Sequence, residues 1–285
     1  MHYNRTMLDV VSEPVSVSVA VVLYHNTESQ LCRFRDALLD AVATVRAALP
    51  VERVSLTVVD NAAAESPTVM QRVFVRMQGI DRVRCLQPEQ NLGYGRAHNL
   101  CLHTDATFHL VLNPDVYLAP DALVHGIQYL QTHADTGLVA PYGENDAGKP
   151  LFLCKRFPSV FDFLLRGFAP VSIQRHFDAR LSRYEMRSVH SGAEPVTGIE
   201  IASGCCMLLR ASVWQALRGF DEAYFLYFED FDLSVRLRKQ STITFLPSMR
   251  IVHDGGHAAR KGWRHVRLFA QSGYRFFVTH GWRWR

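Results

Sequence analysis

The fold is decided by the segment VSVSVAVVLYHN, residues 15–26. Valine occupies alternate positions in its first half, and a period of two with β-branched side chains predicts a buried strand. After a polar break at His25, apolar residues recur at steps of three and four from Leu31 to Leu49, which predicts an amphipathic helix. The chain therefore opens with a strand followed by a helix.

Two later strands are predicted to end in polar residues. The predicted strand Val54–Val59 runs into Asp60-Asn61, and the predicted strand Phe108–Leu112 runs into Asn113-Pro114-Asp115. Strands that alternate with helices indicate a parallel sheet covered by helices on both faces. Ligands of such sheets bind outside the carboxyl ends of the strands. We therefore expect the two polar motifs to converge on one cleft.

The rest of the chain is predicted from periodicity and turn residues. Residues 150–187 lack a clear alternation, and no internal repeat or linker marks a domain boundary. The further predicted elements are a helix from Ser66-Pro67, a strand over Val83–Leu86, helices over residues 93–103 and 120–133, strands over Gly137–Ala140, Ile199–Arg210 and Ile243–Leu246, a helix over Glu229–Lys239 and a helix over Ala258–His280.

Composition places the chain among ordinary globular proteins. It has 285 residues, of which 48% are hydrophobic and 20% charged, which excludes disorder and collagen-like repeats. No uncharged apolar stretch reaches about 18 residues, and the N-terminus has no secretion signal, so neither a membrane span nor export is predicted. The six cysteines form no CxxC pair, which favours reduced thiols over a zinc site or a disulfide framework.

Charge is concentrated at the C-terminus. Residues 255–285 hold seven Lys or Arg, no Asp or Glu, and three of the four tryptophans. Subtracting those seven cations leaves 24 basic against 27 acidic side chains in residues 1–254, so the body is mildly acidic. A basic aromatic terminus is typical of a segment that binds an anionic surface, and a membrane fits better than nucleic acid. The alternative is a helix packed across the domain with a solvated basic face.

Seven short motifs follow one another between Val15 and His280: VAVVLYHN, VVDNAAAES, NLGYGRAHN, LNPDVYL, SGCCMLLR, GFDEAYFLYFEDFDLSVRLRK and VHDGGH. In this order they resemble the inverting family-two glycosyltransferases of the GT-A fold, particularly the rhamnosyltransferase-like branch. The resemblance implies an α/β fold, with a mixed, mostly parallel central sheet flanked by helices. Residues 1–255 would form the GT-A domain, with a nucleotide-binding half at about 1–118 and an acceptor half at about 119–255, followed by the helical tail 256–285.

The implied reaction is inverting transfer of a sugar from a nucleoside diphosphate donor to a hydroxyl of a growing surface glycan, free or lipid-linked. The branch resemblance makes dTDP-rhamnose the first candidate donor, and a UDP-sugar (galactofuranosyl or hexosyl) is the alternative. The enzyme would be cytoplasmic, with peripheral contact to the inner face of the cytoplasmic membrane through its tail. A non-catalytic nucleotide-sugar or glycan binding module is the competing hypothesis. A nucleic-acid binder lacks a motif, and a nicotinamide dehydrogenase lacks GxGxxG after the first strand.

Six residues are candidates for donor binding through the resemblance. Asp60 is expected to accept hydrogen bonds from a uracil or thymine ring, and Asn113 to bond a ribose hydroxyl. The glycines of NLGYGRAHN permit a close backbone approach, and the start of the following helix favours anions. The alternative is that these residues only form turns and helix caps. The full set is Asp60, Asn61, Asn91, Gly93, Arg96 and Asn113.

Asn113-Pro114-Asp115 stands where the family has its DxD metal motif, so Asp115 is expected to contact a divalent cation that bridges the diphosphate. Asn113 replaces the first carboxylate. The resemblance suggests His253 as the second protein ligand, with His257 weaker. Carboxylate and phosphate oxygens suit Mg²⁺ or Mn²⁺, and an imidazole favours Mn²⁺. The alternatives are an Asn-Pro turn and a surface histidine.

Three carboxylates in the run Phe228–Asp232 are the candidate catalytic acids. Transfer to a hydroxyl needs a base near the acceptor. Adjacent helical residues point about 100° apart, so only one of Glu229 and Asp230 is expected to face the reacting carbon. The resemblance places the base on Asp230, while Asp232 would orient the acceptor or brace the loop. The alternative is that these acids only stabilise the dipole of the helix that follows.

Overall fold

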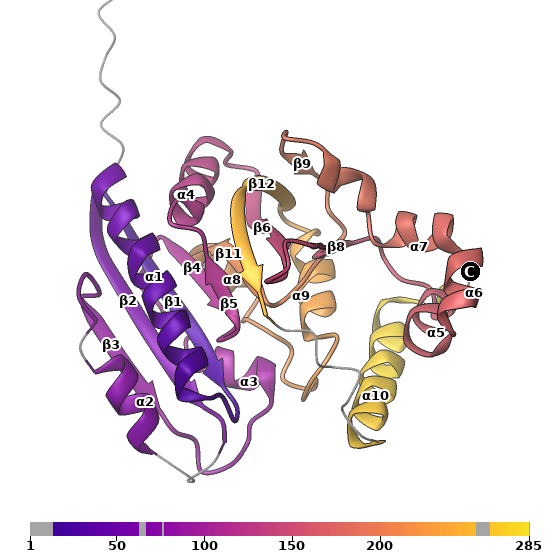
Figure 1. Cartoon of the computed structure of the whole chain (residues 1–285), viewed down its shortest axis with the longest axis horizontal. Helices are drawn as coiled ribbons and strands as arrows, with labels where there is room; N and C mark the ends of the chain where they lie inside the picture. The colour runs from indigo at the N-terminus through magenta and orange to yellow at the C-terminus, as the bar shows by residue number, and fades with distance from the viewer. Residues whose placement is uncertain (1–13, 63–66, 76, 255–262, 285) are drawn as a thin grey trace, which may run out of the picture.

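The computed structural model describes residues 14–62, 67–75, 77–254 and 263–284. Its centre is a mixed ten-stranded sheet of order β3-β2-β1-β4-β11-β6-β12-β5, with β7 paired to β6 and β9 to β12 (Figure 1). A separate two-stranded sheet joins β8 to β10. The strands are β1 (Val15–Leu23), β2 (Val51–Asp60), β3 (Arg82–Leu86), β4 (Phe108–Leu112), β5 (Val116–Leu118), β6 (Thr136–Glu144), β7 (Pro150–Leu151), β8 (Cys154–Lys155), β9 (Val196–Thr197), β10 (Ile201–Ala202), β11 (Cys206–Arg210) and β12 (Thr242–His253).

Helices flank the sheet and form one end of the molecule. Within the described ranges, no helix combines the length and the apolar character that crossing a membrane requires. The residues at which two helices were predicted to begin, Ser66 and Ala258, lie outside the described residues. The helices are α1 (Glu28–Ala48), α2 (Pro67–Phe74), α3 (Tyr94–Asn99), α4 (Ala122–Thr132), α5 (Val160–Phe168), α6 (Val171–His176), α7 (Asp178–Tyr184), the 3-10 helix η1 (Arg187–Ser191), α8 (Ala211–Ala216), α9 (Glu229–Leu237) and α10 (Trp263–His280).

The first half of the chain folds as its pattern predicts. Strand β1 is buried along its whole length and pairs in parallel with both β2 and β4. Its alternate valines join one core cluster with α1, α2 and α4, while Val22 packs with Ala97 of α3 on the opposite face. Helix α1 begins at a capping box, in which the Thr27 side chain accepts a bond from the backbone N–H of Gln30. Helices therefore cover both faces of this parallel region.

The second half departs from the predicted element bounds. The strand predicted over Ile243–Leu246 is too short, because β12 continues to His253 and passes Pro247 at an irregularity in its pairing with β6. The strand predicted over Ile199–Arg210 is two strands, broken at Ser203-Gly204. Because β12 is long, its last residues, Ile251–His253, also pair with β5, and this pairing brings His253 next to the segment that follows Asp115.

An aromatic cluster joins α5, α9 and α10. Phe163 of α5, Phe228 before α9 and Phe276 of α10 are among its members. The ring of Phe228 lies 5.0 Å from that of Phe163 and 5.5 Å from that of Phe276, measured between centroids. The C-terminal helix is thus packed against the segment that precedes the predicted catalytic acids. Figure 1 shows α5, α6 and α10 grouped at one end of the molecule, beside the C-terminus.

Candidate active site

A cleft of about 410 Å³ opens at the carboxyl ends of β1 and β4. Four predicted residues line it together, namely Asn91, Gly93, Asn113 and Asp115. The first turn of α10 closes one side, so the C-terminal helix is part of the cleft wall. The remaining lining residues are Val22, Tyr24, Asn26, Tyr94, Pro114, Phe225, Leu226, Arg264, His265 and Leu268.

The loop before α3 is held from behind by Asn61. Its side-chain amide nitrogen donates to Asn91 Oδ1 (2.9 Å) and to the Gly93 carbonyl oxygen (3.0 Å). Its amide oxygen accepts from the backbone N–H of Leu92 at 2.8 Å. Asn61 is buried and its polar atoms are engaged, so it shapes the cleft rather than lining it. Gly93 has a φ of +79°, and a Cβ there would lie 2.2 Å from the Phe225 carbonyl oxygen.

Besides Asn61, two more predicted donor-binding residues do not line the cleft. Asp60 ends β2, and its Oδ1 accepts from the backbone N–H of Ala62 at 3.1 Å, which is the turn-forming arrangement. Arg96 points away along α3, where its Nε donates to the Glu222 carbonyl oxygen at 3.1 Å. In the structure, Arg96 therefore links α3 to Glu222, in the segment that precedes the acid run.

Asp115 and His253 are brought together by the pairing of β5 with β12. His253 is opposite Val116 in this antiparallel pair, and its Nε2 lies 3.4 Å from Asp115 Oδ1. Burial favours the neutral imidazole, but hydrogen bonds to Asp115 and to Cys205 outweigh it and raise the pKa of His253 to about 10. Sequence reasoning did not connect Cys205 with this histidine.

A carboxylate beside a histidine at the cleft fits a divalent cation that accepts both oxygen and nitrogen ligands, and binding of that cation would displace the proton that the raised pKa keeps on His253. The side chains of Asp115 and His253 are 25% and 17% exposed, and Asp115 lines the cleft directly. Across the described part of the chain, no group of three His, Cys, Asp or Glu residues is arranged to hold a metal ion. A cation at this pair would therefore complete its coordination with oxygens of a bound ligand or of water.

The acid run follows an unusual backbone turn. Tyr227 and Phe228 both have left-handed φ values, 70° and 66°, although neither is glycine. Such residues each cost about 1–3 kcal/mol and persist only where the surroundings fix them. Here α10 fixes them, since Ser272 donates to the Leu226 carbonyl oxygen at 2.8 Å and His265 Nδ1 lies 3.0 Å from the Tyr227 hydroxyl.

Glu229 and Asp230 have opposite surroundings. Asp230 accepts two backbone N–H bonds of 2.9 Å each, one from Gly204 and one from Phe231. Burial raises the pKa of Asp230, while those bonds and the charge of Lys155 oppose the rise. Burial, and then the neighbouring carboxylate, raise the pKa of Glu229, whose Oε2 has no hydrogen-bond partner among the described residues. Asp230 is thus the member of the pair that is built to hold a negative charge.

Asp232 faces away from this pair. Its two carboxylate oxygens contact Arg236 Nε (2.6 Å) and His280 Nε2 (2.8 Å), and it is only 2% exposed. Arg236 also donates to two backbone carbonyl oxygens before α9, those of Leu217 and Gly219. Of the two roles expected for Asp232, these contacts match bracing, with α10 as the partner.

Sequence reasoning missed two residues that face the cleft. The Tyr94 hydroxyl lies 2.6 Å from the Gly204 carbonyl oxygen and 3.0 Å from Asn113 Oδ1, so it links the cleft to the residue that binds Asp230. Arg264 brings a cation to the cleft from α10. Tyr94 stood inside a quoted motif, and Arg264 lay in the basic tail, but neither position in the sequence shows that it reaches the cleft.

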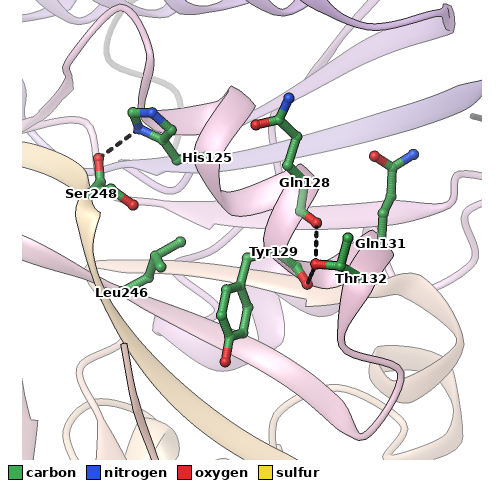
Figure 2. A pocket seen from close by; sticks show the side chains of 7 residues that line it. All are labelled: His125, Gln128, Tyr129, Gln131, Thr132, Leu246 and Ser248. Atoms are coloured by element: carbon green, nitrogen blue, oxygen red, sulfur yellow. Dashed lines mark hydrogen bonds between the residues drawn. The ribbon is translucent and has the colours of Figure 1, made fainter. Parts of the chain in front are cut away.

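A second hollow lies elsewhere, between α4 and β12. Figure 2 shows His125 pointing to the backbone of Ser248, whose carbonyl oxygen is 2.9 Å from His125 Nδ1. This hollow shares no residue with the cleft or the acid run. It holds no Asp, Glu, Lys or Arg, so its lining offers little chemistry.

No family model matches the chain. Two curated proteins are similar to it in sequence. The N-acetylglucosaminyl-diphospho-decaprenol L-rhamnosyltransferase of Mycobacterium tuberculosis (strain H37Rv) is 27% identical over 250 residues, which cover 81% of this chain and 77% of that protein. Rhamnosyltransferase WbbL of Escherichia coli (strain K12) is 25% identical over 181 residues, which cover 59% of this chain and 63% of that protein.

Solved structures share the fold. A Pyrobaculum calidifontis mannosyltransferase in complex with GDP-Man and Mn²⁺ aligns with a TM-score of 0.61 and 16% identity over 93% of this chain and 64% of that one. GalNAc-T7 with UDP, GalNAc and Mn²⁺ aligns with a TM-score of 0.63 and 13% identity, over 93% of this chain and 48% of that one. At these identities the likeness shows the fold alone, and that fold is the GT-A fold expected from the sequence.

Proposed function

We propose that this chain, a glycosyltransferase with the GT-A fold, transfers L-rhamnose with inversion from dTDP-rhamnose to a hydroxyl of a lipid-linked glycan. The observation that carries the catalytic part is the setting of Asp230, a half-buried carboxylate held by two backbone N–H groups, one of them from Gly204, whose carbonyl oxygen bonds the cleft residue Tyr94. The donor sugar and the acceptor class rest on the similarity to the two rhamnosyltransferases, one of which is named for a decaprenol-linked acceptor.

The cleft would hold the donor. Asn113 and the backbone of the loop at Asn91 and Gly93 face the space that a nucleoside would fill. Asp115 and His253 would hold Mn²⁺ or Mg²⁺, which when bound neutralises charge on the diphosphate leaving group. Arg264 would add a second positive charge from the α10 side.

Asp230 would act as the general base. It would accept the proton of the acceptor hydroxyl as that oxygen bonds to the anomeric carbon and the nucleoside diphosphate departs from the opposite face. Glu229 would stay protonated near neutral pH and so leave the negative charge on its neighbour. Tyr94 would keep Gly204 in place, and Asp232 would brace α9 through His280.

The acceptor would enter from the second half of the chain. We assign the donor side to about residues 1–118, the acceptor side to about 119–255, and the remaining residues to a C-terminal helical segment. A lipid-linked acceptor implies a membrane, and we propose a cytoplasmic enzyme that attaches to it peripherally through this segment.

The test is donor binding and hydrolysis across a panel of dTDP-, UDP- and GDP-sugars, with Mn²⁺, Mg²⁺ or EDTA. Wild type is compared with Asp115→Ala and with Asp121→Ala, an exposed control six residues further on. Metal-dependent release of dTDP, lost only in Asp115→Ala, supports the proposal. Preference for a UDP-sugar would replace the donor, and binding without any turnover on lipid-linked acceptors would favour a non-catalytic module.

A further inference from the structure

Exposed apolar side chains are concentrated at one end of the molecule. The described residues include eleven large hydrophobic side chains that are exposed, and eight of them lie in α5, α6, α10 and the residues after α10. In α5 and α6 these are Leu164 (52% exposed), Val171 (63%) and Ile173 (46%). On the surface of a soluble protein, exposed hydrophobic side chains are usually isolated from one another, so a cluster of them marks an interaction site.

Helix α10 has two distinct faces. Its inner face packs against Phe228 through Phe269 and Phe276, and Ser272 bonds the carbonyl oxygen of Leu226 just before the acid run. Trp263 and Tyr274 are exposed by 81% and 65%, and they lie on the opposite side of the helix. Successive helical residues turn by about 100°, which places Trp263, Arg267, Tyr274 and Val278 within about 60° of one another. The outer face is therefore a stripe of aromatic, aliphatic and cationic side chains.

The residues after α10 join this stripe to α5. The Trp282 ring stacks on Phe277 at 5.3 Å and on Trp284 at 5.1 Å between centroids. The Arg283 carbonyl oxygen accepts a 2.8 Å bond from the backbone N–H of Val160, the first residue of α5. The outer stripe of α10, the two tryptophans and the exposed residues of α5 and α6 thus form one region, here called the apolar end (Figure 1).

The apolar end is also positively charged. Residues 160–177 and 263–284 contain one carboxylate, Asp162, which is buried and bonded to Arg180. The same residues expose six arginines, of which two pair with acids of neighbouring segments. The six are Arg166, Arg175, Arg264, Arg267, Arg275 and Arg283. Exposed tryptophan combined with arginine is the composition of surfaces that lie in the interface of an anionic bilayer.

We infer that the apolar end docks on an anionic lipid bilayer, with the outer face of α10 and the exposed residues of α5 and α6 in the headgroup layer. This deepens the proposed function and rests on it for the lipid-linked acceptor. It also adds α5 and α6 to the basic segment that the sequence indicates. The first turn of α10 lines the cleft, so docking would hold the cleft next to the bilayer that carries the acceptor.

The test is flotation of the full chain with vesicles of equimolar phosphatidylcholine and phosphatidylglycerol, and with phosphatidylcholine vesicles alone. We expect binding only to the anionic vesicles, and its reversal by salt. The double variant Val171→Ser/Ile173→Ser should weaken vesicle binding about tenfold, through loss of buried apolar area. Arg267→Ala should weaken it roughly fivefold, the effect of one cation near the surface.

The matched control is the pair Val75→Ser and Leu100→Ser, at positions that are 63% and 43% exposed but are not part of the apolar end. These changes should leave vesicle binding unaltered. Transfer to a water-soluble acceptor should be the same in all variants, which separates docking from catalysis and reports correct folding.

Three outcomes overturn the inference. They are no binding of wild type to anionic vesicles, equal binding by the α6 variant, and concentration-dependent dimerisation that buries the apolar end instead. Any of them can occur while donor turnover is normal, in which case the proposed function stands. If the chain binds anionic vesicles but turns over no nucleotide sugar, the docking inference stands and the proposed function fails.

Discussion

The two neighbouring acids of α9 offer a direct test of the proposed chemistry. In Asp230→Asn the charge is lost, and the amide offers one acceptor oxygen where the carboxylate accepts from both Gly204 and Phe231. We expect kcat to fall by about 10²–10⁴-fold, or about 3–5 kcal/mol of transition-state stabilisation. One backbone N–H also loses its partner, which should reduce the free energy of unfolding by about 1–3 kcal/mol.

Glu229→Gln is the matched variant, since it changes the adjacent carboxyl group in the same way. Burial and the charge of Asp230 raise the pKa of Glu229, so near neutral pH an amide replaces a neutral acid. We expect kcat within about threefold of wild type and little change in unfolding free energy, because no hydrogen bond to Oε2 is lost among the described residues.

The assay is the pH dependence of transfer at saturating donor, together with urea unfolding of each variant. Wild type should gain activity with rising pH as Asp230 ionises, at a pH above the ordinary range for aspartate because burial raises its pKa. A second change on the alkaline side, where Glu229 ionises, should vanish in Glu229→Gln. An equal loss of kcat in both variants, with donor binding intact in both, would refute the assignment of distinct roles.

Three further predictions concern the cleft and the core. Arg264→Ala should weaken the binding of a nucleoside diphosphate about tenfold but that of the nucleoside little, while Arg267→Ala should change neither, as measured by calorimetry. Gly93→Ala should cost at least about 2 kcal/mol of unfolding free energy and reduce donor affinity, since its φ is left-handed and its Cβ would overlap a backbone carbonyl oxygen. His98 and His109 are fully buried, and burial lowers the pKa of each from 6.5 to about 3. The unfolded chain therefore binds protons below pH 6.5 that the folded one does not, so these two residues should reduce stability by about 3 kcal/mol at about pH 5.5, which urea unfolding across pH would detect.

The first half of the fold could be predicted because its signals are local. The alternating valines of β1 and the three- and four-residue steps of α1 each mark the face that the element packs into the core, so the pattern can be recognised within the segment itself. The convergence of polar strand ends follows from parallel pairing, and it brings Asn113 and Asp115 to the cleft beside Asn91. These inferences needed only the periodicity of the chain and the direction of its strands.

The rest depended on contacts between distant segments. Arg96 belongs to a motif that lines the cleft, but its side chain bonds the carbonyl oxygen of Glu222 and does not point into the cleft. The sequence did not predict that β12 continues beyond Pro247, because a proline normally ends a strand. Here the strand continues because its pairing with β6 is irregular between Leu246 and Arg250. The basic, aromatic composition of the C-terminal segment indicated its outer face only. Its inner face depends on contacts that only the fold creates, the bond of Ser272 to Leu226 just before the acid run and that of His280 to Asp232 within it.

The position of α10 after the acid run in the chain has a consequence for biosynthesis. Domains fold as units while the chain emerges from the ribosome, starting from the N-terminus. The strained residues Tyr227 and Phe228 emerge well before His265 and Ser272, which bond the backbone and side chains of that turn. The central sheet can therefore assemble first, while the acids acquire their final arrangement only after α10 has been translated. A nascent chain that stops before α10 would have a formed sheet and an inactive site, so the enzyme would gain activity only once α10 has been made and has packed against the acids.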